Sequence, residues 1–200
     1  MTLYNIKPAF QNFLRPLTRL MYFQGITANQ VTIIAMLASV ILGMGLTLFP
    51  QTQLFILMPV FLFIRMALNA IDGILAREFN QKSQVGAILN EVGDIVADAA
   101  LYLPFAFLKG INPWLVVLVV FLAWLTEFCG VVFQTLTGVR SYKGPMGKSD
   151  RALVLGAMGG VIAFWPNYIF IANIVFGMSC LLLIWTCINR CRNVREVVDV

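Results

Sequence analysis

The apolar residues of this chain occur in long unbroken runs, whereas a soluble protein would show alternating or narrow amphipathic patterns. A helix that crosses a bilayer needs about 20 apolar residues. Six stretches approach that length: about 28–49, 53–76, 85–108, 113–136, 151–166 and 168–189. The connections between them are short, and the chain contains no internal repeat and no linker. The pattern predicts an all-α integral membrane protein in which residues 1–200 form one domain with six transmembrane helices.

The segment before the first apolar stretch, residues 4–22, has a different pattern. Phe10, Leu14, Leu17 and Met21 recur at helical spacing, and the basic side chains fall on the other faces. Such a segment is typical of an amphipathic helix that lies in the membrane interface. The simpler alternative is an ordinary lead-in to the first span; we favour the interfacial helix.

Composition and charge agree with this topology and orient it. Hydrophobic residues make up 60% of the chain and charged residues 12%, with a net charge of +5. Six crossings would put both termini and the second and fourth connections on one side. Nearly all basic residues fall on that side, and Lys109 alone falls on the other. Because basic residues mark cytoplasmic loops, we expect both termini in the cytoplasm. The expected partners are membrane lipids, and no nucleic acid.

Polar side chains inside two neighbouring spans are the candidate chemistry, because a polar group in a bilayer is costly and needs a reason. They recur at helical spacing along one face of the second span and one face of the third: Arg65, Asn69 and Asp72, then Asn90, Asp94 and Asp98. Two antiparallel helices would aim these stripes at each other near the cytoplasmic surface. The chain has no histidine, so carboxylates are the candidates for proton transfer.

Facing carboxylates and amides at that depth favour a divalent cation, since Mg²⁺ is held by a few carboxylates together with substrate phosphates. Gly73 and Gly86 leave room for a headgroup, and Arg77 can pair with a phosphate or a stripe carboxylate. The alternative is structural: Asp72 with Arg77, or Asp98 with Arg65, would be buried ion pairs that lock helices together. One pair would suffice for a lock, so the number of polar groups favours function.

The spacing of these residues resembles a family signature. Asp72-Gly73-x-x-Ala76-Arg77 is followed by eight residues, Gly86, three residues, Asn90, three residues and Asp94. The order resembles that of the CDP-alcohol phosphatidyltransferases, and the segment Thr27-Ala28-Asn29-Gln30-Val31-Thr32 resembles a second family motif. The signature carries four aspartates, and here Asn69 and Asn90 stand at the first and third of these positions.

The resemblance implies an enzyme that transfers a phosphatidyl group from a CDP-linked lipid, expected to be CDP-diacylglycerol, to an alcohol, with release of CMP. It implies catalytic roles for Asp72 and Asp94, with Asp94 as a metal ligand or the base. One Mg²⁺ or Mn²⁺ ion would be held by these two with Asn69 and Asn90, and Asp98 would compensate for the missing charge. The implied CDP-lipid pocket is Gly73, Ala76, Arg77, Gly86, Asn29 and Thr32. A homodimer in a bacterial inner membrane is also implied.

The acceptor side is indicated by basic residues around the connection before the fifth span. Arg140, Lys148 and Arg151 gather there among glycines. They are either topological positive charges or a pocket for an acceptor that carries a phosphate, and the resemblance slightly favours the pocket.

Two other functions remain open. Intramembrane carboxylates also mark ion pathways, so a transporter is one alternative. Polar residues are scarce in the outer halves of the spans, however, and a path across the membrane would need them there. The two asparagines leave a second alternative: a homologue that binds CDP-lipid but has lost catalysis.

Overall fold

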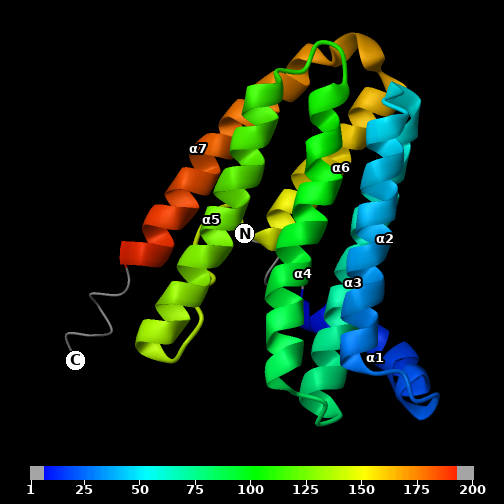
Figure 1. The fold of residues 1–200 in the computed structure, drawn as a ribbon, viewed down its shortest axis with the longest axis vertical. Coiled ribbons are helices and arrows are strands. Elements are labelled where there is room, and N and C mark those ends of the chain that lie inside the picture. Colours follow the sequence, from blue (N-terminus) through cyan, green and yellow to red (C-terminus); the bar gives the residue numbers. More distant parts are fainter. Residues whose placement is uncertain (1–6, 193–200) are drawn as a thin grey trace.

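The computed structural model describes residues 7–192, and these form an all-helical bundle (Figure 1). The α-helices are α1 (Lys7–Phe23), α2 (Ala28–Leu48), α3 (Leu57–Glu78), α4 (Gln84–Tyr102), α5 (Pro113–Thr137), α6 (Lys148–Phe164) and α7 (Phe170–Arg192). Short 3₁₀ turns precede α3, follow α4 and precede α7: Thr52–Ile56, Leu103–Phe107 and Pro166–Tyr168. The all-α prediction is confirmed, and residues 4–6 of the predicted first helix lie outside the described residues.

Four of the six predicted spans are long and apolar enough to cross a membrane. They are Ala28–Leu48, Thr52–Glu78, Pro113–Thr137 and Phe170–Arg192. The two others do not qualify by composition or length. Helix α4 carries Glu91, Asp94 and Asp98, and α6 is 17 residues long and begins with charged side chains. The acidic residues of α4 and the short length of α6 therefore set these two helices apart from the other four.

Helix α1 lies across one end of the bundle, against the last turns of α3 (Figure 1). Leu14 is buried and packs with Ile71 and Leu75 of α3. On the outer side, Arg15 donates to Glu78 Oε1 over 2.9 Å, and this hydrogen bond raises the pKa of the Arg15 guanidinium above its ordinary value. Phe13 stays 79% exposed, as expected of a helix with one face free for lipid.

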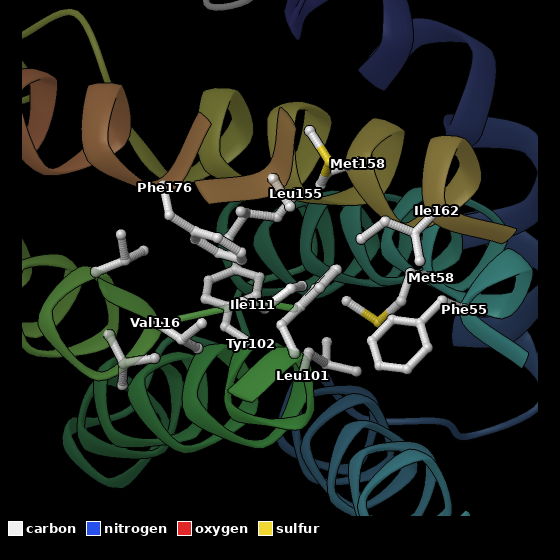
Figure 2. Packing of buried hydrophobic residues seen from close by; sticks show 14 of the residues in the cluster. Phe55, Met58, Leu101, Tyr102, Ile111, Val116, Leu155, Met158, Ile162 and Phe176 are labelled. Carbon is white, nitrogen blue, oxygen red and sulfur yellow. The ribbon is translucent and has the colours of Figure 1, made fainter. Parts of the chain in front are cut away.

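The opposite half of the bundle is filled by aromatic and aliphatic side chains (Figure 2). The ring of Phe105 lies 4.8 Å from that of Phe55 and 5.5 Å from that of Phe176, and all three are fully buried. Helices α2 and α4 approach closely here, since a Cβ on Gly43 would collide with the backbone carbonyl of Ala100. This packing is almost wholly apolar, with the buried hydroxyl group of Tyr102 as an exception.

The connection between α5 and α6 folds back into the bundle. Helix α5 ends at Gly138, which has a φ of 73°. Ser141 and Met146 are then buried, and Met146 N donates to Thr186 Oγ1 of α7 over 3.1 Å. Gly144, with a φ of 141°, lies so close to Thr186 that a side chain would collide with it. Helix α6 therefore begins partway along the bundle (Figure 1), which carries its first charged residues into the interior.

Candidate functional site

The two polar stripes of α3 and α4 face each other. Asn69 Nδ2 of α3 donates to Asp94 Oδ1 of α4 over 3.0 Å. One turn further along α3, Asp72 Oδ2 accepts a 2.8 Å hydrogen bond from Thr32 Oγ1 of α2. Asp72 and Asp94 are only 4% and 7% exposed. We call Asn69, Asp72, Asn90 and Asp94 the stripe; Asn90 lies half-buried one turn before Asp94.

The start of α2 closes one side of the stripe. Thr27 caps the helix in a reciprocal pair with Gln30, whose side chain accepts from the Thr27 backbone N–H. The next turn presents Asn29 and Thr32. Thr32 reaches Asp72, and Asn29 lies against Gly86 at the start of α4. This short segment therefore both begins a helix and supplies two polar side chains to the site.

Two glycines allow polar side chains to approach the backbone beside the stripe. A Cβ on Gly86 would lie 2.6 Å from Asn29 Oδ1, and a Cβ on Gly73 would lie 2.9 Å from Arg77 Nη2. The guanidinium of Arg77 thus folds back over Gly73. Ala76, between them on α3, packs against the small apolar cluster under α1. The backbone at Gly73 therefore lies directly beside the guanidinium group of Arg77.

Asp94 is held by three helices. Arg65 Nη2 donates to Asp94 Oδ1 over 3.1 Å, in addition to the hydrogen bond from Asn69. Asp94 Oδ2 accepts no hydrogen bond but forms an ion pair with the ammonium group of Lys148, the first residue of α6. Lys148 also interacts electrostatically with Asp72. Lys148 therefore links the two stripe carboxylates.

Asp98 has a different environment from that expected of a metal ligand. Its Oδ1 accepts from Arg65 Nη1 over 2.6 Å, and its Oδ2 accepts from Arg151 Nη2 over 2.8 Å. Both oxygens are thus used by guanidinium groups, as in the ion-pair alternative for Asp98 with Arg65. The suggested pair of Asp72 with Arg77 is not among the ion pairs of residues 7–192, where Asp72 bonds Thr32 instead.

A second polar centre surrounds Glu127 of α5. Its Oε1 lies 3.0 Å from Arg151 Nη2, and its Oε2 lies 3.0 Å from Arg140 Nη2 and 3.6 Å from Arg190 Nη1. We call these four residues the Glu127 cluster. Arg151 and Arg190 are 0% and 2% exposed. A single carboxylate thus receives guanidinium groups from the inserted connection, α6 and α7.

Sequence reasoning missed Arg190, which it counted only among the cytoplasmic charges. Arg190 also donates to the backbone carbonyl of Thr126, so it ties the end of α7 to α5. The available signal was its position on the buried face of α7, four and seven residues after Thr186 and Leu183. The partners of Glu127 are thus arginines from three separate segments of the chain.

The three basic residues suggested for the acceptor all have carboxylate partners. Lys148 pairs with Asp94, and Arg140 pairs with Glu91 and Glu127. Arg151 pairs with Asp98 and Glu127. The structure brings them into the interior near the stripe, but their charges are already matched there.

The stripe suits one divalent cation at most. Among residues 7–192, no group of three or more acidic, cysteine or histidine side chains could hold a metal ion by itself. Two buried carboxylates with neighbouring amides remain, Asp72 and Asp94, and Asp94 Oδ2 is paired only with the Lys148 ammonium group, which a cation can replace. Mg²⁺ is commonly bound by one or two carboxylates and completed by substrate phosphates. The residues present therefore fit a single ion whose coordination a bound diphosphate completes.

Comparisons with known proteins extend over nearly the whole chain. The family model described as CDP-alcohol phosphatidyltransferase matches residues 25–185. Inner membrane protein YnbA of Escherichia coli (strain K12) is 53% identical over 194 residues, which cover 97% of this chain and 96% of YnbA. Phosphatidylinositol phosphate synthase of Mycobacterium tuberculosis (strain ATCC 25618 / H37Rv) is 25% identical over 205 residues, covering 94% of this chain and 88% of the synthase.

Solved structures show the same fold. The crystal structure of Mycobacterium tuberculosis phosphatidylinositol phosphate synthase (PgsA1) with CDP-DAG bound has a TM-score of 0.74, covering 90% of this chain and 92% of that chain at 21% identity. The same enzyme in complex with manganese and citrate also gives 0.74, covering 90% and 88% at 20% identity. At this identity the likeness establishes the fold and no more.

Proposed function

Because the chain belongs to the CDP-alcohol phosphatidyltransferase family, we propose that it transfers a phosphatidyl group from a CDP-linked lipid, CDP-diacylglycerol, to an alcohol and releases CMP. One observation carries the proposal. The signature residues of α3 and α4 meet across the helix interface, where Asn69 Nδ2 bonds Asp94 Oδ1 over 3.0 Å. The buried carboxylates of Asp72 and Asp94, the backbone at Gly73 and the guanidinium group of Arg77 therefore lie near one another.

The donor would bind along the stripe. Gly73 and Gly86 allow the CDP group to approach the backbone, and Arg77 is placed to pair with a phosphate. Asn29 and Thr32 border the same space from α2, and Ala76 supports it from below. A single Mg²⁺ or Mn²⁺ ion held by Asp72 and Asp94 would neutralise charge on the diphosphate, with the amides of Asn69 and Asn90 nearby. The lipid chains would remain in the bilayer.

The transfer itself is a displacement at the phosphorus that carries the lipid. The acceptor oxygen forms a bond to that phosphorus, and the bond from phosphorus to the oxygen of the CMP phosphate breaks, so that CMP leaves with the electron pair. Asp94 Oδ2, which accepts no hydrogen bond from the protein, takes the proton of the acceptor hydroxyl. Lys148, whose side chain is 34% exposed, then pairs with the donor phosphates in place of Asp94.

We further propose that residues 1–200 act as one domain with six crossings, in which α4 and α6 span the bilayer beside the four apolar helices. The distribution of basic residues along the sequence supports a cytoplasmic location for the termini and the site, in a bacterial inner membrane. The alignment with an inner membrane protein supports this localisation. A homodimer remains a prediction from the family resemblance.

A transporter is less compatible with the packing. The half of the bundle away from the stripe is filled by Phe55, Phe105 and Phe176, which are fully buried. A path for ions would need polar groups there.

The test is CMP release by the purified chain in detergent, with CDP-diacylglycerol, Mg²⁺ or Mn²⁺, and a panel of alcohols. We expect CMP that depends on the acceptor and is abolished by chelator and by Asp94→Asn. CDP-lipid binding without CMP for any alcohol would contradict the transferase and identify the silent homologue, in which Asn69 and Asn90 have removed catalysis.

A further inference from the structure

We infer that the acceptor alcohol of this chain carries no phosphate, and that Glu127 is the residue that determines this preference. The inference rests on the proposed function and names the substrate class of the same site. It reverses the expectation that Arg140, Lys148 and Arg151 form a pocket for a phosphorylated acceptor. The basis is the set of ion pairs in which those side chains take part.

The basic side chains of the interior are matched in number by carboxylates. Inside the bundle, the ion pairs of the described residues join five cations to four carboxylates: Arg65, Arg140, Lys148, Arg151 and Arg190 with Glu91, Asp94, Asp98 and Glu127. Asp72, with which Lys148 also interacts, brings the carboxylates to five. Within residues 7–192, the interior ion pairs therefore leave no surplus positive charge for a second anion.

Glu127 occupies the position that an anion would take. Three guanidinium groups converge on its two oxygens, at 3.0, 3.0 and 3.6 Å. A cluster of arginines is the usual recognition element for a phosphate, because each guanidinium offers paired donors. Here a carboxylate of the protein already accepts from that cluster. A phosphate would have to displace Glu127 and leave it buried without a partner, which is strongly unfavourable.

The donor alone can be neutralised at the stripe. Its diphosphate is balanced by one divalent ion, and Lys148 and Arg77 lie beside it. A phosphorylated acceptor would add further negative charge in a partly desolvated site where every other cation is paired. A hydroxyl compound without charge meets no such cost and can hydrogen-bond to carboxylates and amides.

The cluster is not sealed from small solutes. The side chain of Glu91 is 32% exposed, that of Arg140 is 13% exposed, and that of Lys148 is 34% exposed. A phosphate ion in solution could therefore reach Arg140. The exclusion that we propose is electrostatic rather than steric, and a change in charge should remove it.

The experiment measures binding of radiolabelled inorganic phosphate to the full chain in detergent by equilibrium dialysis, and compares glycerol with glycerol 3-phosphate as acceptors. We expect the wild type to bind no phosphate at millimolar concentration and to use glycerol in preference to glycerol 3-phosphate. Glu127→Gln should bind phosphate at least about tenfold more tightly than the wild type, because charge-assisted donors become free. Glu78→Gln, which removes an exposed carboxylate from Arg15, is the matched control and should bind phosphate no more tightly than the wild type.

The outcomes separate the inference from the proposed function. Phosphate binding by the wild type as tight as by Glu127→Gln, or a preference for glycerol 3-phosphate, overturns the inference. If no acceptor is used, the proposed transferase activity is wrong. The comparison of phosphate binding still tests whether Glu127 excludes phosphate. If Glu127→Gln does not fold, Glu91→Gln, which frees the more exposed face of Arg140, takes its place with a smaller expected gain. If the variants fold but bind phosphate no more tightly than the wild type, the inference is wrong.

Discussion

The stripe and the Glu127 cluster are neighbouring groups of buried polar residues, yet they are built differently. In the stripe, Asp72 and Asp94 are bonded by a hydroxyl, an amide, one guanidinium and one ammonium, and Asp94 Oδ2 accepts no hydrogen bond. Glycines lie beside them. In the cluster, both oxygens of Glu127 face guanidinium groups, and Arg151 and Arg190 are buried.

The difference separates residues that wait for a ligand from residues that hold helices together. A buried carboxylate whose second oxygen is paired only with the partly exposed ammonium group of Lys148 can exchange that partner for a metal ion or a proton. A buried carboxylate with every oxygen paired is neutralised, and removing one partner leaves an uncompensated charge. From sequence, Asp94 and Asp98 look alike, one turn apart on the same face, but they belong to opposite classes.

The largest expected effect is on catalysis, from Asp94→Asn in the stripe. If Asp94 accepts the acceptor's proton, CMP release should fall by about 10² to 10⁴. The unfolding temperature should change little, since Arg65 keeps its bond to Asp98. Full activity in this variant would remove Asp94 from the mechanism. Glu78→Gln again provides the control, with unchanged activity.

The next largest effect is on stability, from Glu127→Gln in the cluster. Loss of this carboxylate leaves three guanidinium groups facing each other, and breaking a buried ion pair in this way costs about 3–5 kcal/mol. Thermal unfolding in detergent should show the loss, and the double variant with Arg190→Gln should recover part of it. An unchanged unfolding temperature would mean that the cluster is not a structural lock.

A smaller effect, on the binding of a metal ion, should distinguish the stripe from the Glu127 cluster. Asn69→Asp adds a carboxylate beside Asp94, in place of the amide that donates to it over 3.0 Å. Without metal the two carboxylates repel and the unfolding temperature should fall. With Mn²⁺ it should recover, and Mn²⁺ binding measured by electron paramagnetic resonance should tighten by about tenfold, because added ligand charge raises affinity for hard ions. Equal Mn²⁺ affinity in both proteins would argue against an ion at the stripe.

The smallest effect, on CDP-lipid binding, tests the role of the glycine backbone beside the stripe. In Gly73→Ala the new Cβ would meet only the flexible end of Arg77, at 2.9 Å. The fold should persist, while displacement of Arg77 weakens CDP-lipid binding by a few fold. Gly45→Ala on α2 is the matched control, since its Cβ would meet nothing within 4 Å. Equal binding by both variants would show that Gly73 is not part of the donor pocket.

The periodic parts of the chain could be predicted from sequence. The helical stretches and the two facing stripes followed from spacing alone, because positions three and four apart share a helix face. Four of the six stretches qualify as spans. Helix α4 does not, because it carries three acidic residues that the bundle pairs internally, and α6 does not, because it is only 17 residues long.

The parts that depend on tertiary contacts could not be predicted. Residues 139–147, rich in glycine and basic side chains, resembled an exposed cytoplasmic loop, yet Ser141 and Met146 are buried. The same insertion brings Lys148 to Asp94. Arg190 looked like one more positive-inside charge, because nothing local reveals that Glu127 lies across from it. Which of several arginines pairs with which carboxylate depends on how the helices pack.

The central claim is that an open stripe transfers a lipid phosphate to an alcohol while a closed cluster excludes charged acceptors. The most direct measurement supplies the wild-type chain with CDP-diacylglycerol, Mg²⁺ and equal amounts of glycerol and glycerol 3-phosphate, and identifies the lipid product by mass spectrometry. The account predicts a product that carries glycerol without a terminal phosphate, together with equimolar CMP. A product that carries glycerol phosphate would contradict the closed cluster, and the absence of both product and CMP would contradict the transferase.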